Sequence, residues 1–172
     1  MMQIASTFLD LISGANLMSL ESDLMAEEVE HLDLSRFAAV SPGQSVSKVL
    51  EQMRSEKNNC ALVVENERLA GIFTERDVLL KVVDNSDVWE TPISEIMTVT
   101  DATISSTENV SRAVEKMKAG HFRNLPVLDE EGRVVGNLTQ EAIIKFLAEH
   151  FPEAVYNLPP DPSKIAGNRA GA

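Results

Sequence analysis

The second half of the chain repeats the pattern of the first half at an offset of about 64 residues, which brings Val46 onto Val110. In each half, apolar residues recur at the i, i+3, i+4, i+7 spacing of an amphipathic helix. Ser45 and Asn109 precede the two stripes in register, and both residue types favour the N-cap position. The stripes consist of Val46, Val49, Leu50 and Met53 in the first half and Val110, Ala113, Val114 and Met117 in the second.

Each predicted helix is followed by two short apolar segments that flank a polar turn, and then by a hydroxyl residue, Thr74 or Thr139, that opens a second helix. The length and the β-branched content of these segments predict strands. The second turn is one residue longer, so the offset becomes 65 after it. The predicted strands, with a leading strand in each copy, are 38–40, 61–64 and 69–73, then 102–104, 125–128 and 134–138.

The pattern predicts an α/β fold of the α+β kind, in which two βαββα repeats pack about a pseudo-two-fold axis. A unit of roughly 60 residues is marginally stable alone, so we expect the repeats to pack on each other, with equivalent segments lining the cleft between them. We expect a helical extension at 1–34, the repeats at 35–95 and 96–150, and a proline-rich extended strap at 151–172. The apolar stripes of the extension fit either a cover for the core or a docking helix for a partner protein.

Composition limits the function. The formal net charge is -12 and the pI about 4.6, which argues against general binding to nucleic acid or to an anionic membrane. A single cysteine, Cys60, fits a reducing compartment, and no lysine or arginine precedes Arg36, so we expect a cytoplasmic protein without a leader or membrane helix. The scattered histidines and the lack of a nucleophile with a nearby base predict neither a metal site nor an enzyme.

One segment carries the chemistry, the strand-to-helix turn from Gly71 to Asp77. A helix N-terminus presents unpaired N–H groups that suit an anion, and Asp77 is placed to accept hydrogen bonds from two adjacent hydroxyls, as on a ribose. Thr-x-x-Asp is equally the pattern of a capping box, in which the acid binds the Thr74 amide. Ala142 stands at the equivalent position of the second copy, so the fold does not require the acid. Both interpretations stay open.

The turn from Gly71 to Asp77 and the strand Arg123-Asn-Leu-Pro-Val-Leu-Asp129 resemble the two motifs of the cystathionine-β-synthase (CBS) domain pair, over about 33–149. The chain departs from that pattern at Asn59, where the family favours a basic residue, and at Ala142. The resemblance implies a regulatory module, typically a flat homodimer, that binds AMP, ADP, ATP or a related adenosyl ligand. The second-helix faces, with Val78, Leu79 and Val82 and with Ile143, Ile144 and Leu147, would suit the dimer contact.

The resemblance also implies residue roles. Asp77 would hold the ribose, the Thr74 hydroxyl would face the phosphate, and Arg123 would supply the cation. The whole implied site is Ile72, Thr74 and Asp77, with Thr100, Asp101 and Ala102 meeting the adenine and Phe122 and Arg123 closing it. A reciprocal site would lack its acid and its cation, so we expect it to be weaker or empty; it comprises Arg36, Phe37, Ala38, Asn58, Leu138 and Thr139. The alternative is an interaction scaffold with vestigial sites, recruited through residues 1–34.

Overall fold

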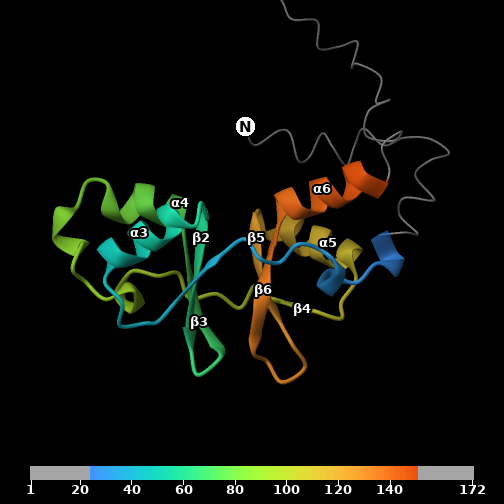
Figure 1. Ribbon diagram of the computed structural model, residues 1–172, viewed down its shortest axis with the longest axis horizontal. Coiled ribbons are helices and arrows are strands. Elements are labelled where there is room, and N and C mark those ends of the chain that lie inside the picture. The colour runs from blue at the N-terminus through green and yellow to red at the C-terminus, as the bar shows by residue number, and fades with distance from the viewer. Residues whose placement is uncertain (1–23, 151–172) are drawn as a thin grey trace, which may run out of the picture.

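The computed structural model describes residues 24–150, which form two small sheets side by side at the centre, with helices on their outer sides (Figure 1). The predicted strand, helix, strand, strand, helix order is present in both copies. The first contains β1 (Ala38–Val40), α3 (Val46–Ser55), β2 (Cys60–Glu65), β3 (Arg68–Thr74), α4 (Glu75–Asp77) and η2 (Val78–Val82). The second contains β4 (Ile104–Ser105), α5 (Val110–Gly120), β5 (Asn124–Leu128), β6 (Val134–Thr139) and α6 (Gln140–His150). Short 3-10 turns lie at Val29–His31, Ser86–Val88 and Ile93–Glu95.

The strand pairing is the same in both sheets. The first strand pairs parallel with the second, and the second pairs antiparallel with the third. The register is also equivalent, because Cys60 faces Thr74 in one sheet and Asn124 faces Thr139 in the other. The α+β fold and the internal repeat predicted from the sequence are therefore confirmed.

The structure corrects the leading strand of the second copy, which was predicted at 102–104 and lies at Ile104–Ser105. The backbone N–H of Ala102 donates to the Thr100 hydroxyl over 3.0 Å, and the N–H of Thr103 donates to the Asp101 carbonyl over 2.9 Å. These local bonds hold 100–103 in a turn, because a threonine side chain competes with the strand ladder for backbone donors.

Of the two predicted N-cap residues, Asn109 caps its helix through its side chain and Ser45 does not. The Asn109 side chain accepts a hydrogen bond from the N–H of Arg112 over 2.9 Å, as an N-cap residue should. Ser45 occupies the equivalent N-cap position, but its hydroxyl makes no capping bond and instead lies 3.1 Å from that of Ser47. The extra residue of the second hairpin turn is accommodated at Gly132, whose φ of 77° favours glycine.

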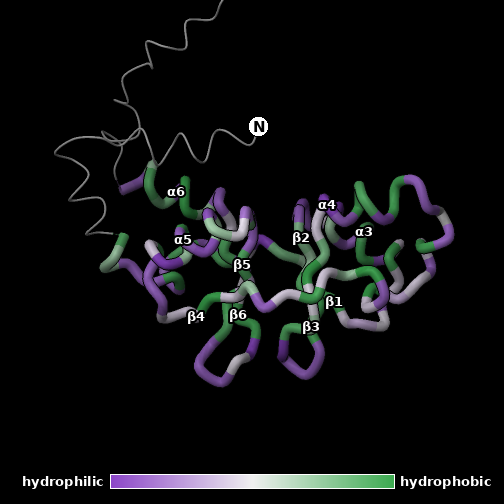
Figure 2. The backbone as a smooth tube through the Cα atoms, turned by 180° about the vertical axis from the view of Figure 1, so that it is seen from behind, coloured by the Kyte–Doolittle hydropathy of each residue, from purple (hydrophilic) through white to green (hydrophobic). Residues whose placement is uncertain are grey.

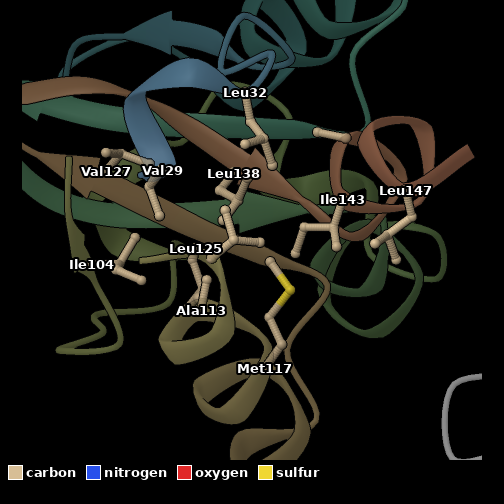
Figure 3. Packing of buried hydrophobic residues seen from close by; sticks show 12 residues of the cluster. Val29, Leu32, Ile104, Ala113, Met117, Leu125, Val127, Leu138, Ile143 and Leu147 are labelled. Atoms are coloured by element: carbon tan, nitrogen blue, oxygen red, sulfur yellow. The ribbon is translucent and has the colours of Figure 1, made fainter. Parts of the chain in front are cut away.

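Each repeat has its own hydrophobic core, and the core of the second repeat extends to residues outside the repeat. Figure 3 shows Val29 and Leu32 packed on the apolar side chains of β5, β6 and α6. The segment is tied down by backbone bonds from Val29 to Glu108 and from Val110 to Glu27, both 2.9 Å. Residues 1–23 of the predicted helical extension and the predicted strap at 151–172 lie outside the described residues.

The second-helix faces proposed for a dimer contact are only partly free. Val82, Ile143 and Leu147 are 2%, 6% and 7% exposed and fill the cores of their own repeats. Leu79 and Ile144, on the opposite side of the same segments, are 69% and 53% exposed. The prediction from the sequence combines the two faces because the helical spacing does not say which side packs inward. In the described residues no helix has the length and apolar character needed to cross a membrane.

The two repeats exchange segments across their interface. The strand β3 pairs at Ile72 with Thr98 through two backbone bonds of 2.9 and 2.8 Å, and Thr98 leads into the second repeat. Conversely, the N–H of Asn137 in β6 donates to the Leu34 carbonyl over 2.9 Å, and Leu34 leads into the first repeat. Figure 2 shows hydrophobic segments at the centre of the molecule and hydrophilic hairpin turns at one edge. In each repeat the third strand therefore pairs with a segment that leads into the other repeat.

Candidate functional site

The site begins where β3 ends and α4 starts. Thr74 is the N-cap residue, and Asp77, in the third helical position, turns its carboxylate back toward it. Asp77 Oδ2 accepts hydrogen bonds from the Thr74 N–H over 3.0 Å and from the Thr74 hydroxyl over 2.9 Å. The capping interpretation of this motif is therefore confirmed; the ligand role of Asp77 stays a prediction.

The other carboxylate oxygen of Asp77 has two further donors. Asp77 Oδ1 accepts from the Thr98 hydroxyl over 2.8 Å and lies 2.8 Å from the Lys81 ammonium. Burial raises the pKa of the Asp77 carboxyl, but the hydrogen bonds from Lys81, Thr98 and Thr74 outweigh that effect and hold the pKa below its usual 3.8. Asp77 is therefore ionised at neutral pH although its exposed fraction is only 7%.

The second repeat caps the same helix without an acid. The Thr139 hydroxyl accepts from the N–H of Ala142 over 3.0 Å, and both residues are buried. At the offset of 65, Phe146 stands where the first repeat has Lys81. The second repeat thus lacks both the carboxylate and its ammonium partner, which confines this charge pair to the first repeat.

The segment between the repeats lies against Asp77 and the residues that are bonded to its carboxylate. Ile72 is 9% exposed and is bonded through its backbone to Thr98, the residue whose hydroxyl reaches Asp77. Two residues further on, the turn of Thr100, Asp101 and Ala102 begins. Six of the eight predicted site residues are therefore carried by one connected assembly of β3, α4 and this segment.

Phe122 and Arg123 come from the second repeat. They directly precede β5. The backbone N–H of Gln140 donates to the Arg123 carbonyl, and its side-chain amide donates to the Phe122 carbonyl, both over 3.1 Å. This places them beside the start of α6, at the same edge of the molecule as α4 (Figure 1). The Phe122 ring is 37% exposed, and within residues 24–150 neither the phenyl ring nor the Arg123 guanidinium is bonded to the Asp77 group.

A cavity of about 450 Å³ lies on the first repeat, beside η2. Lys81, Asp84 and Glu95 contribute charged groups to its wall, together with Leu80, Asn85, Val88, Ile96 and Met97. None of the eight predicted site residues lines it. The cavity and the predicted site meet only at Lys81, whose ammonium reaches Asp77.

Sequence reasoning missed Lys81 and Thr98. The i,i+4 spacing of Asp77 and Lys81 was a usable signal, because residues four apart on a helix are neighbours. Thr98 gave no signal, since it is 21 residues from Asp77 and only the crossing of the segment between the repeats brings it there.

The residues predicted for the reciprocal site are mostly packed or bonded within the chain. Ala38 and Leu138 are fully buried, and Thr139 is 5% exposed and capped to Ala142. Arg36 Nη2 lies 3.8 Å from Glu141 Oε1, an exposed pair, and Asn58 donates to Glu56 over 3.1 Å. The position that corresponds to Asp77 is Ala142, so this predicted site has no carboxylate there.

Two other groups lie outside the predicted site, the Cys60 thiol and a surface cluster of Glu28, Glu30 and His31. Burial, with a smaller effect from the charge of Asp77, raises the pKa of the Cys60 thiol to about 12, so the thiol stays protonated in the folded protein. The ligand atoms of Glu28, Glu30 and His31 lie within 4.8 Å of one another at the surface. Acidic clusters of this kind are common without an ion, and nothing else in the described residues points to one.

Comparison with known proteins identifies the fold. The model of the CBS domain matches the chain twice, at residues 22–84 and 93–149. This chain belongs to the CBS domain family. A CBS domain-containing protein of Arabidopsis thaliana is 38% identical over 105 residues, which cover 60% of this chain and 19% of that protein. A homoserine O-acetyltransferase of Methanohalobium evestigatum is 30% identical over 129 residues, 74% of this chain and 24% of that enzyme.

Two solved structures extend the comparison. A CBS domain crystal structure, NE2398, is 31% identical with a TM-score of 0.59, covering 64% of this chain and 86% of that one. The cytosolic domain of the Mg²⁺ channel MgtE, solved with ATP, is 27% identical with a TM-score of 0.60, covering 70% and 49%. CBS domain pairs are regulatory modules, and this chain spans about a fifth to a quarter of the curated relatives described above.

Proposed function

We propose that this protein is a regulatory module that binds AMP, ADP or ATP between its CBS repeats and signals by a change in conformation or oligomeric state, with no chemistry of its own. The carboxylate of Asp77 carries the proposal. It is buried, ionised and present in only one repeat, although the other repeat caps the same helix without it. A carboxylate of this kind is a suitable acceptor for two adjacent ribose hydroxyls.

In this proposal the nucleotide is held from both repeats. Asp77 takes the ribose, Thr74 faces the phosphate, and Arg123 supplies the cation. The exposed Arg123 side chain supports that role, because within residues 24–150 its guanidinium makes no hydrogen bond or ion pair. The MgtE domain solved with ATP supports the ligand class. Ile72, Thr100, Asp101, Ala102 and Phe122 complete the proposed site.

A thermal-shift measurement with AMP, ADP and ATP tests the proposal. A ligand that binds only the folded protein stabilises it by about 2.7 kcal/mol at 100 times its dissociation constant, so the unfolding midpoint of the wild type should rise. Asp77→Ala should lose most of that shift. Glu141→Gln, which removes an exposed acid at the start of α6, should keep it.

Two results would refute the assigned ribose role of Asp77. One is an equal shift in wild type and Asp77→Ala; the other is no shift with any of the three nucleotides. Should Asp77→Ala fail to fold, Asp77→Asn keeps the shape of the side chain and serves in its place, with folding checked by circular dichroism.

The second candidate is an interaction scaffold. The observation that favours it is the satisfied state of Asp77, whose two oxygens already accept from Thr74, Thr98 and Lys81. A scaffold should not respond to any adenosyl ligand, and it should lose its partner or dimer on deletion of the N-terminal residues. That deletion should stop at residue 23, because Val29 and Leu32 belong to the core of the second repeat.

We also propose a homodimer, through the exposed apolar side chains that follow α4. One short segment exposes three large apolar side chains, those of Leu79, Leu80 and Val83, at 69%, 76% and 61%. A group of exposed apolar side chains of this kind is typical of a surface that contacts another protein. Leu80→Glu should dissociate the dimer in analytical ultracentrifugation. Val135→Glu, at a 47% exposed apolar residue on β6, is the matched control and should not. A monomeric wild type would contradict the proposal.

A further inference from the structure

The Lys81 ammonium is fully engaged in the structure. Its Nζ lies 2.8 Å from Asp77 Oδ1 and donates to the Ile96 carbonyl over 2.7 Å and to the Thr98 hydroxyl over 3.2 Å. An ammonium group has three donors, and these three contacts use all of them. Lys81 is therefore the resident cation of the Asp77 carboxylate and is not free to receive a ligand without breaking these bonds.

The carboxylate is equally occupied. Each oxygen of Asp77 has two protein donors, which together fill the four or so lone-pair positions of a carboxylate. The bonds to Oδ2 come from Thr74 and hold the start of the helix. The bonds to Oδ1 come from the side chains of Thr98 and Lys81, which can rotate away. A ribose that presents two hydroxyls must therefore replace some of these donors. The Thr74 N–H is fixed by the start of the helix, whereas the Thr74 and Thr98 hydroxyls and the Lys81 ammonium can move.

The structure also offers the displaced ammonium another position. Lys81 lines the cavity of about 450 Å³, and the carboxylate residues Asp84 and Glu95 line the same cavity. Its side chain is already 36% exposed, so the movement does not require opening of the core. The second repeat, with Ala142 and Phe146 at the equivalent positions, has neither member of the pair.

We propose that Lys81 competes with the ribose for Asp77 and so sets the affinity of the site for ligands that carry ribose hydroxyls. The inference rests on the proposed function. Binding exchanges the Lys81 contact for ribose hydroxyls, and the ammonium moves toward Asp84 and Glu95. The same exchange releases the Ile96 carbonyl and the Thr98 hydroxyl, which belong to the segment between the repeats. Lys81 acts through Asp77 and is a specificity-determining residue.

Isothermal titration calorimetry with two ligands tests the competition. AMP carries both ribose hydroxyls, and 2′,3′-dideoxyadenosine monophosphate carries neither. Lys81→Met keeps the length of the side chain and removes the charge, so it should bind AMP about three- to tenfold more tightly than the wild type. Its affinity for the dideoxy compound should not change. A purely structural role for Lys81 would alter both ligands alike, so the ratio of the two affinities is the decisive reading.

Lys145→Met is the matched control, because Lys145 is an exposed lysine of α6 that pairs four residues along its helix with Glu149, at 4.0 Å. It should change neither affinity. Weaker AMP binding by Lys81→Met would overturn the proposal and make Lys81 a ligand contact. Equal changes for both ligands, or no change, would overturn it as well.

If the wild type and Lys81→Met both fail to bind AMP, the proposed function fails, and the competition falls with it. The resident ion pair is then judged separately by a double-mutant cycle on the unfolding of the ligand-free protein. Asp77→Asn and Lys81→Met should be non-additive, since the two side chains are in contact. Additive effects would refute the ion pair itself. If only Lys81→Met binds AMP, the competition is supported in its strongest form.

Discussion

The Thr98 hydroxyl donates a 2.8 Å hydrogen bond to Asp77 Oδ1, and it does so from the segment that joins the two repeats. The backbone of the same residue is bonded twice to Ile72 in β3. A group that takes Oδ1 of Asp77 therefore acts directly on the connection between the repeats. This coupling gives a proposed ligand a physical route from the first repeat to the second.

The close approach of this segment to β3 predicts a large effect at Gly71. A Cβ added at Gly71 would lie 2.6 Å from Met97 Sδ and 3.0 Å from the Thr98 carbonyl oxygen. Gly71→Ala should therefore lower the free energy of unfolding by about 1–3 kcal/mol, because the segment must shift. Urea denaturation measures it. Gly43→Ala, where an added Cβ meets nothing within 4 Å, is the control and should be close to neutral.

The second repeat offers an independent check of the same relationship. A Cβ at Gly136 would lie 2.5 Å from the Leu34 side chain and 3.0 Å from its carbonyl oxygen. Gly136→Ala should be destabilising to a similar extent. If both variants were as stable as Gly43→Ala, the two crossing segments could not lie where the structure places them.

Arg123 should act on the phosphate alone. Its guanidinium is exposed and unpaired within residues 24–150, so Arg123→Ala should leave the free energy of unfolding unchanged within about 0.5 kcal/mol. Loss of a charge-assisted contact should weaken AMP binding about tenfold or more, while adenosine binding changes little. Calorimetric titration with both ligands separates the two effects. An equal loss for adenosine would contradict the assignment of Arg123 to the phosphate.

The raised pKa of the Cys60 thiol predicts how the free energy of unfolding changes at alkaline pH. Its pKa is raised to about 12 in the folded protein, against 9.0 for an ordinary thiol, so above pH 9 the unfolded chain loses a proton that the folded chain keeps. Fewer protons on the unfolded state mean that stability falls as pH rises. The contribution of Cys60 is fully present below pH 9 and declines by about 1.4 kcal/mol per unit up to about pH 12.

The measurement is urea denaturation at several pH values for wild type and Cys60→Ala. The substitution lowers stability at neutral pH, but it should remove this part of the alkaline slope, so the two curves should converge. Parallel curves from pH 9 upward would show that the thiol ionises normally in the folded protein.

Contacts between residues close in the sequence could be predicted for this fold. Contacts made where the chain crosses from one repeat to the other could not. Helical stripes and N-cap residues such as Asn109 show their chemistry within a few residues, and the repeat doubles each signal. The Thr74–Asp77 contact is also local. By contrast, Thr98 reaches Asp77, and Leu34 reaches β6, only because the chain crosses between the repeats, and no local pattern encodes that path.

Two errors of prediction have physical causes of the same kind. The strand at 102–104 gave way to a turn because the Thr100 hydroxyl takes the Ala102 N–H, a choice that apolar content does not reveal. The predicted dimer face combines inward and outward residues, because helical spacing does not say which side of a segment packs inward. In the first repeat the segment Val78–Val82 is also a π turn, where the ordinary spacing fails. The role of Lys81 was missed although its spacing from Asp77 was visible.

We propose one nucleotide site for each chain, centred on Asp77. Calorimetric titration of the wild type and of Asp77→Asn with AMP tests it most directly. We expect saturation at about one AMP per wild-type chain, and heat close to the dilution blank for Asp77→Asn. Two equal sites per chain, or undiminished binding by Asp77→Asn, would contradict it.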